Sequence, residues 1–119
     1  MSKHIIKEII VEMLREQEGI LMNAFMQFDR FREYAFGDQM MTHKDYPNWV
    51  FMIDVNLSCA HAFNELLDAE IITLKSVSLP VALAGGDFYK LPLADPRKKH
   101  RSQHWMPMIA LKGPNFPEE

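Results

Sequence analysis

This sequence has a single cysteine, Cys59, and no long run of apolar residues. One cysteine cannot form an internal disulfide, so the composition favours a reducing compartment. The longest uninterrupted apolar run, Trp49 to Ile53, is far shorter than the roughly 20 residues that a transmembrane helix needs. Lys7, Glu8 and Glu12 interrupt the N-terminal apolar positions, which is unlike a secretory signal. These absences predict a cytoplasmic protein without a membrane segment.

Signals for catalysis and for metal binding are equally scarce. The five histidines show no His-x-x-x-His spacing on a predicted helix; they are His4, His43, His61, His100 and His104. His100 and His104 are four residues apart, but they lie in a predicted loop beside cations that disfavour a metal ion. Gly85-Gly86 is not followed by Gly-Lys-Ser/Thr, so it indicates a turn and not a phosphate loop. We therefore expect no enzymatic activity, no metal and no cofactor.

The charge balance is small but unevenly placed. The 119 residues fit one domain with a real core, and their 48% hydrophobic and 24% charged content is ordinary for a globular protein. Residues 1–70 carry six Lys/Arg against twelve Asp/Glu, whereas residues 71–119 carry seven against four. An acidic front half and a basic back half indicate different partners for the two parts, although salt screens so small an excess.

The stretch from Asn56 to Leu74 combines a well-marked helix with a strand. Asn56 and Ser58 can each accept a hydrogen bond from the first turn of a helix that begins near Leu57. Apolar residues then recur at three- and four-residue steps, which places them on one buried face; they are Cys59, Ala62, Phe63, Leu66 and Ala69. On that face the thiol of Cys59 is inert packing. The β-branched run from Ile71 to Leu74 then predicts a strand.

A capped helix that runs directly into a strand resembles the second helix of a helix-turn-helix followed by the first strand of a wing. This is the arrangement of winged-helix domains, and the resemblance covers Trp49 to about Lys112. It implies an α+β fold, a winged helix with a long N-terminal helical region and a small C-terminal antiparallel β-sheet. We expect one domain over residues 1–119, divided into an N-terminal helical region (1–36), a winged-helix region (47–112) and a loose tail (113–119).

The N-terminal region from Lys3 to about Phe36 has a long helical stripe of apolar residues. Gly19 costs roughly 1 kcal/mol inside a helix, so this region is either two helices or one bent helix. The stripe has two interpretations: it packs on the core of its own domain, or it pairs with a second copy in a homodimer. The second interpretation assigns the dimer interface to Ile6, Ile10, Met13, Ile20 and Phe28.

The segments that flank the capped helix are shorter. Gly37 is expected to cap the preceding helix, and Pro47 to start a short helix that carries Trp49, Met52 and Ile53; one unbroken helix from Pro47 to Ala69 is the alternative. In the C-terminal half, frequent proline and glycine and segments of strand length then predict a small antiparallel sheet whose strands are Val77–Leu83, Phe88–Leu93 and Trp105–Leu111. Its first two strands flank a glycine hairpin, and its last two flank the loop from Ala94 to His104. Phe25, Phe28 and Phe31 are interpreted as core or interface packing, and Trp105 as packing beneath the wing.

The most concentrated chemical feature is Asp95-Pro96-Arg97-Lys98-Lys99-His100-Arg101. Four cations at the tip of a wing are suited to contact phosphates or a minor groove. The outward face of the capped helix, in contrast, has no lysine or arginine and includes Glu65 and Asp68, which repel phosphates. The acidic face favours a protein partner, and the basic loop favours nucleic acid.

Two functions follow from these features. The first is a winged-helix regulatory protein that binds double-stranded DNA, with contact residues Ser58, His61, Asn64, Arg97, Lys98, Lys99, His100 and Arg101. Asn64 could pair with adenine, and His61 could donate to a base or phosphate. The alternative is a non-enzymatic interaction or inhibitor protein, of the kind encoded by phages or plasmids, whose acidic helical surface docks on a basic site of another protein.

Overall fold

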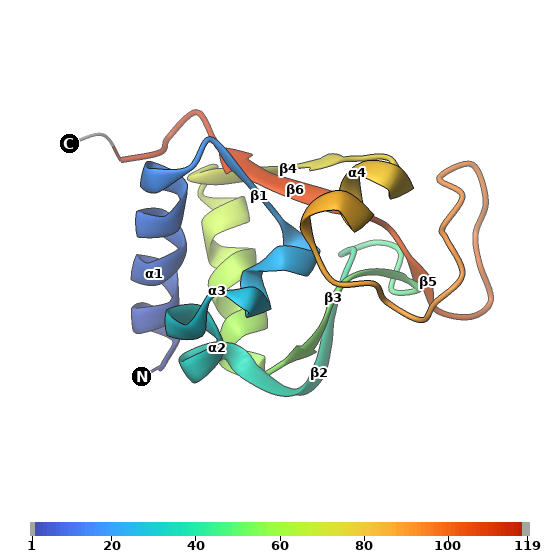
Figure 1. The fold of residues 1–119 in the computed structure, drawn as a ribbon, viewed down its shortest axis with the longest axis horizontal. Helices are drawn as coiled ribbons and strands as arrows, with labels where there is room; N and C mark the ends of the chain where they lie inside the picture. The colour runs from blue at the N-terminus through green and yellow to red at the C-terminus, as the bar shows by residue number, and fades with distance from the viewer. Residues whose placement is uncertain (1, 118–119) are drawn as a thin grey trace.

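The chain is built from helices and short strands, with a long loop over residues 86–103 (Figure 1). The computed structural model describes residues 2–117. The elements are α1 (Ser2–Glu16), β1 (Gly19–Leu21), the 3-10 helix η1 (Met22–Gln27), α2 (Asp29–Ala35), β2 (Phe36–Thr42), β3 (Trp49–Val55), α3 (Leu57–Asp68), β4 (Ile72–Ser76), α4 (Leu79–Gly85), β5 (His104–Trp105) and β6 (Met108–Lys112). The molecule measures 41 × 27 × 27 Å, with α1 and α3 at one end and the loop between α4 and β5 at the other.

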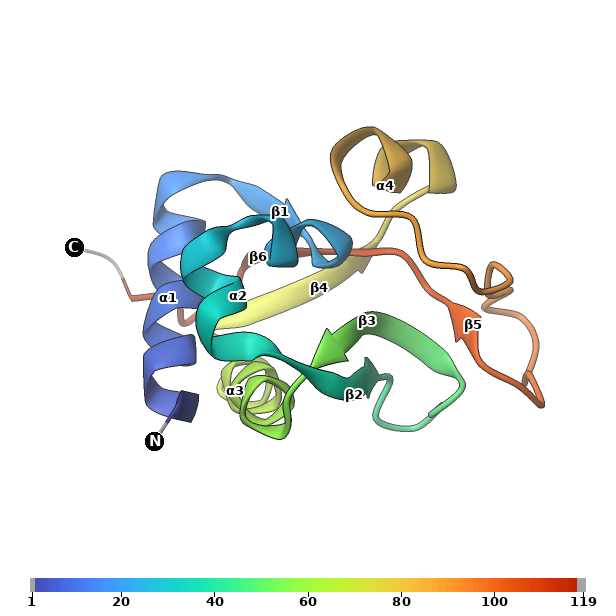
Figure 2. The same cartoon turned by 60° about the horizontal axis from the view of Figure 1, so that its bottom comes forward.

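The strands form two separate sheets of three strands each (Figure 2). In the first sheet the order is β1-β6-β4, and both pairings are antiparallel. In the second the order is β2-β3-β5, where β2 pairs with β3 antiparallel through register shifts and β5 pairs with β3 in parallel. The α+β class is therefore confirmed, with two small sheets in place of the one sheet that we expected.

The N-terminal region is not one long helix. It breaks after α1 because Gly19 to Leu21 form β1, which pairs with Leu111 to Ile109 of β6. Gly19 lies so close to that strand that an added Cβ would meet side-chain atoms of Ile109 and Leu111 at 2.9 Å. Pairing with a strand some ninety residues away overrides a helical phase that continues across the glycine in the sequence.

The apolar stripe of this region packs inside the protomer. Four of the five residues that we assigned to a dimer interface are fully or almost fully buried in the core of the protomer; they are Ile6, Ile10, Met13 and Ile20. The fifth, Phe28, is half-buried. Since these four side chains have no exposed surface to offer, the assignment of a dimer interface to them was wrong. The alternative, that the stripe covers the core of its own domain, is the observed packing.

Three phenylalanines link the N-terminal region to α3. Phe25 lies 5.0 Å from Phe31 and 5.3 Å from Phe63 between ring centroids, the second pair edge to face. All three rings are fully buried. Such pairs contribute about 0.5–1.5 kcal/mol each beyond the apolar area that they bury.

The capped helix and the strand after it form as predicted. The Asn56 side chain accepts a hydrogen bond from the Cys59 backbone N–H at 2.8 Å, and α3 begins at the next residue, Leu57. Cys59, Ala62, Phe63 and Leu66 are buried, as their spacing indicates. Ala69, the fifth residue of the predicted face, is exposed because α3 ends before it and it is the C-cap residue. β4 follows after Glu70, whose positive φ of 57° ends the helical turn.

The segment before α3 is a strand, so the helix predicted from Pro47 to Ile53 was wrong. β3 is the central strand of its sheet, and Val50, Phe51 and Met52 are all buried. A run of consecutive apolar residues suits a strand that has neighbours on both edges and is covered on both faces. The element before α3 is consequently not the first helix of a helix-turn-helix pair. Gly37, which we expected at a helix C-cap, lies in β2 and allows close approach, since an added Cβ would lie 2.7 Å from the Asn56 Cα.

The C-terminal half differs most from its prediction. The segment predicted as a strand at Val77–Leu83 overlaps the helix α4, which extends to Gly85. Ser78 at the N-cap position and Pro80 in the first turn are two helix-start signals that the strand prediction overlooked. Residues 88–93 form no strand beyond a single bridge from Leu93 to Trp105. The third predicted strand divides into β5 and β6 around Pro107, where the chain passes from one sheet to the other.

Two smaller expectations concern Trp105 and the tail. Trp105 is buried against Tyr89 and Ala82, beneath α4 and the loop that follows it. The tail is docked as far as the structure describes it, because the Asn115 backbone N–H donates to the Glu70 carbonyl at 2.9 Å and Phe116 is buried. The loose tail that we predicted from residue 113 is thus wrong up to residue 117, and residues 118–119 lie outside the described part.

Candidate nucleic-acid interface

The basic stretch lies in the loop of residues 86–103, between α4 and β5, and not at a hairpin tip. It begins with a turn in which the Asp95 carbonyl accepts the Lys98 backbone N–H at 3.0 Å, with Pro96 at the second position. The Asp95 carboxylate accepts the Arg97 guanidinium N–H groups, both at 3.1 Å, and the Arg97 backbone N–H at 3.0 Å. These hydrogen bonds lower the pKa of Asp95 to about 2. Arg97 is therefore already paired with a carboxylate inside the loop.

The other three cations are exposed. Among residues 2–117, Lys98, Lys99 and Arg101 have no carboxylate within ion-pair distance. They follow one another within four positions, at the end of the molecule opposite α1 and α3. Their charges are thus available to an anionic partner.

Asn48 ties this loop to the second sheet. Its side-chain Nδ2 donates to the His100 carbonyl at 2.7 Å, and its own carbonyl accepts the His104 backbone N–H at 2.7 Å. The Asp95 backbone N–H donates to His100 Nε2 at 2.9 Å, and the rings of His100 and His104 stack with centroids 3.7 Å apart. The basic loop is consequently held in one conformation by backbone and side-chain bonds, although it contains no regular structure.

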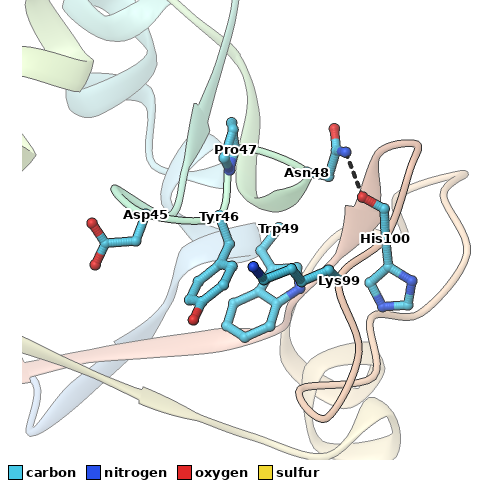
Figure 3. A pocket seen from close by; sticks show the side chains of 7 residues that line it. All are labelled: Asp45, Tyr46, Pro47, Asn48, Trp49, Lys99 and His100. Atoms are coloured by element: carbon cyan, nitrogen blue, oxygen red, sulfur yellow. Dashed lines mark hydrogen bonds between the residues drawn. The ribbon is translucent and has the colours of Figure 1, made fainter.

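A cleft separates the basic loop from the β2–β3 loop (Figure 3). It has a volume of about 200 Å³, and its lining residues are Asp45, Tyr46, Pro47, Asn48, Trp49, Lys99 and His100. The rings of Tyr46 and Trp49 stack at 4.5 Å with an interplanar angle of 26°. The His43 ring packs against both of them, with its centroid 5.0 Å from the ring centroid of Tyr46 and 5.2 Å from that of Trp49. The cleft thus places a fixed aromatic pair opposite a lysine and a histidine.

One polar atom in this cleft has no partner. The indole Nε1 of Trp49 is buried and makes no hydrogen bond to any described residue. Figure 3 shows it on the edge of the indole toward Lys99. An indole N–H can only donate, and leaving such a donor unpaired is unfavourable. The Nε1 of Trp105 is likewise buried without a partner among the described residues, so this feature is not specific to the cleft.

The predicted contact residues of α3 lie elsewhere. His61 and Asn64 are exposed and Ser58 is half-buried. Asn64 lines a second cleft together with Asp68 and the β2–β3 loop, and Pro47 lines both clefts. The structure therefore brings Lys99 and His100 together with Tyr46 and Trp49, while the α3 residues lie on the other side of the β2–β3 loop.

Lysines of α1 neutralise part of the negative charge on the outward face of α3. Glu65 accepts from Lys7 at 2.9 Å and pairs with Lys3 at 2.6 Å. The hydrogen bonds from these two lysines of α1 lower the pKa of Glu65 to about 2. Asp68 remains exposed beside Asn64, so the outward face of α3 still repels phosphates at its C-terminal end.

Sequence reasoning missed the aromatic half of the cleft. His43, Tyr46 and Trp49 recur at three-residue steps in a polar segment before a buried strand, and this spacing is the one local signal that pointed to a ring cluster. Their position opposite Lys99, some fifty residues later, has no signal in the sequence. The prediction that Cys59 lies on the buried face of the helix is confirmed. Its thiol is fully buried, and burial raises the pKa of Cys59 to about 12.

Residues 2–117 contain no group of three or more His, Cys, Asp or Glu side chains arranged to hold a metal ion. Over the same residues, no helix combines the length and the apolar character needed to cross a bilayer. No protein-family model matches this chain, and neither curated proteins nor solved structures show a significant match to it. The geometry of the chain itself is therefore the basis for the functional proposal.

Proposed function

We propose that this protein is a non-catalytic, nucleic-acid-binding regulatory protein whose basic loop contacts the phosphate backbone. The observation that carries the proposal is the cluster of three exposed cations, Lys98, Lys99 and Arg101, without a carboxylate partner among the described residues. Backbone contacts from lysine and arginine supply most of the sequence-independent affinity of such proteins. The hydrogen bonds of Asn48 support the proposal, because a fixed loop loses little conformational freedom on binding.

A double-stranded partner rests on the part of the winged-helix resemblance that remains, because the strand β3 precedes α3 where a helix-turn-helix has its first helix. α3 followed by β4 keeps the order of a recognition helix and a wing strand, and Ser58, His61 and Asn64 would then approach a groove. The absence of cations on the outward face of α3 weakens this role, so the basic loop would supply the affinity. Duplex DNA is accordingly one of two partners to test, and a single strand is the other.

The test compares two charge-matched double variants in fluorescence anisotropy titrations from about 50 to 200 mM salt. Lys98→Ala/Arg101→Ala removes two charges from the loop, while Lys75→Ala/Lys112→Ala removes two exposed charges from the other sheet. If both loop cations contact phosphates, the slope of log affinity against log salt falls by about 1.8 for a duplex and about 1.4 for a single strand. At roughly 0.1 M salt these slopes correspond to losses of about 60-fold and 25-fold.

The control variant should bind as wild type does. Equal losses in the two variants would mean that net charge alone attracts nucleic acid. No binding by the wild-type protein to either partner at the lowest salt would reject the proposal.

A second candidate function is a non-enzymatic interaction protein. The observation that favours it is a pair of exposed apolar side chains, one at the start of β2 and one at the start of α3: Phe36 is 62% exposed and Leu57 is 60% exposed. The side chain of Asn56, which precedes Leu57, contacts the Phe36 carbonyl. Exposed apolar groups beside an acidic helix are typical of protein-docking surfaces. A second copy of the chain is the simplest occupant. Light scattering at micromolar concentration should then give a dimer mass that Leu57→Glu reduces to the monomer mass, and a wild-type monomer would reject self-association.

A further inference from the structure

We infer that the cleft between the β2–β3 loop and the basic loop binds an unstacked nucleobase, with the attached phosphate directed toward Lys99. This inference rests on the proposed nucleic-acid-binding function and makes it more specific. It assigns the partner to a single strand or to a base that has left its stack, because bases inside a duplex have no free face. The chemistry that it names is one nucleotide unit: a flat ring and an anion.

The aromatic wall of the cleft supplies a stacking surface that is already in place. One face of the Tyr46 ring lies on Trp49, at 4.5 Å and 26°, and His43 supports both rings from the side. Tyr46 is nevertheless 38% exposed, since it lies at the mouth of the cleft. A ring that is held on one side and open on the other is the arrangement on which bases stack in proteins that bind single strands.

The size of the cleft restricts its occupant. A volume of about 200 Å³ lies below the range of roughly 300–1,000 Å³ that holds drug-sized ligands. The space therefore suits one flat ring system better than a larger ligand.

Charged groups distinguish the two sides of the cleft. Lys99 lies at one side, and Lys98 and Arg101 are close to it in the loop. The Asp45 carboxylate lies at the other side, where Figure 3 shows it pointing away from the rings. The phosphate is therefore expected at the Lys99 side, away from Asp45.

The experiment measures the affinity for a single-stranded oligonucleotide, for the matched duplex and for a mononucleotide, with anisotropy and tryptophan fluorescence as readouts. Trp49 lines the cleft, whereas Trp105 is buried elsewhere, so base stacking should quench Trp49 and leave the Trp105 signal constant. Tyr46→Ala should lose roughly 10-fold or more in single-strand affinity without a change in the salt slope. Tyr46→Phe, which keeps the ring, should remain within about 2-fold of wild type.

The control is Phe36→Ala, which removes an exposed aromatic ring that lies outside the cleft. Lys99→Ala should reduce the salt slope by about 0.7 on a single strand, because it removes one phosphate contact. Urea midpoints close to wild type for Tyr46→Ala and Lys99→Ala would confirm that the variants are folded. The expected order of wild-type affinity is single strand over duplex.

The outcomes separate this inference from the proposed function. If Tyr46→Ala binds a single strand as wild type does while Lys98→Ala/Arg101→Ala loses affinity, the basic loop remains a nucleic-acid contact and the base-binding cleft is rejected. Preference of the wild-type protein for the duplex also rejects it. Saturable quenching by a mononucleotide, without binding of any oligonucleotide, would overturn the single-strand assignment together with the proposed function.

Discussion

The side chain of Asn56 joins three parts of the structure, and its removal gives the sharpest stability prediction. Its Oδ1 accepts the Cys59 N–H at 2.8 Å at the start of α3, and its Nδ2 donates to the Tyr34 carbonyl at 2.7 Å at the end of α2. A third contact, to the Phe36 carbonyl at 3.4 Å, is too long to contribute much. One side chain therefore caps one helix and satisfies a backbone acceptor of another.

The two hydrogen bonds give separate contributions to the free energy of unfolding. Loss of the N-cap costs about 1 kcal/mol, and a partly buried carbonyl left without its donor costs about 1–3 kcal/mol. Asn56→Ala should therefore lower the free energy of unfolding by about 2–4 kcal/mol. Asn56→Ser keeps a cap acceptor but cannot reach the Tyr34 carbonyl, so it should lose about 1 kcal/mol less than Asn56→Ala.

Urea denaturation measures both variants. With an m-value of about 1.5 kcal/mol/M, a loss of 3 kcal/mol moves the midpoint by roughly 2 M. Asn64→Ala, an exposed change on the same helix, is the control and should remain within about 0.5 kcal/mol of wild type. A loss below about 0.5 kcal/mol for Asn56→Ala would refute the reasoning, and equal losses for the serine and alanine variants would refute the cap contribution.

Three further predictions follow from burial and charge. Phe63→Ala empties a fully buried site in the aromatic cluster and should cost about 3–5 kcal/mol, whereas Phe36→Ala should remain within about 0.5 kcal/mol in the same urea titration. Glu65 has a pKa lowered from 4.5 to about 2 by hydrogen bonds from two lysines of α1, so its contribution to stability is present above about pH 4.5 and is lost as the pH falls toward 2. The melting temperatures of wild type and Glu65→Gln should therefore differ at neutral pH and converge in acid. Cys59 should resist a thiol reagent in the native protein and react fully in denaturant, because its side chain is buried and its pKa is raised.

Each of these predictions has a contrary result. Similar losses for Phe63→Ala and Phe36→Ala would contradict the packing of the aromatic cluster. A constant difference in melting temperature between wild type and Glu65→Gln down to about pH 2 would contradict the ion pairs as the cause. Rapid native labelling of Cys59 would show that the N-terminal half of α3 opens readily.

The basic loop and the aromatic cleft differ in how far the sequence could predict them. The cations from Arg97 to Arg101 are a local cluster, and the Asp95-Pro96 turn that presents them depends on neighbours within three residues. The cleft depends on Asn48, whose side chain reaches the His100 carbonyl across 52 residues of chain. No pattern within a short window contains that contact, so Tyr46 and Trp49 could not be assigned to the site in advance.

The sequence by itself determined the elements whose causes are local. α3 begins where Asn56 caps a backbone N–H three residues later, and its buried face follows from apolar spacing within a few turns. The burial of Cys59 and the change to a strand after Glu70 belong to the same class. These features depend on hydrogen bonds and periodicities that span at most about a dozen residues.

Only the tertiary structure decided the rest. Residues 49–55 keep an apolar phase that fits a helix, but β3 forms because β2 and β5 supply backbone partners on its two edges. Gly19 to Leu21 leave the helical stripe because β6 pairs with them. From its sequence, the apolar face of α1 could pack on the core of the same protomer or on a second copy. In the structure it packs against α2 and α3 of the same protomer, where its apolar side chains are buried. In each case a distant strand or helix supplied the hydrogen bonds or the apolar surface that local propensity left open.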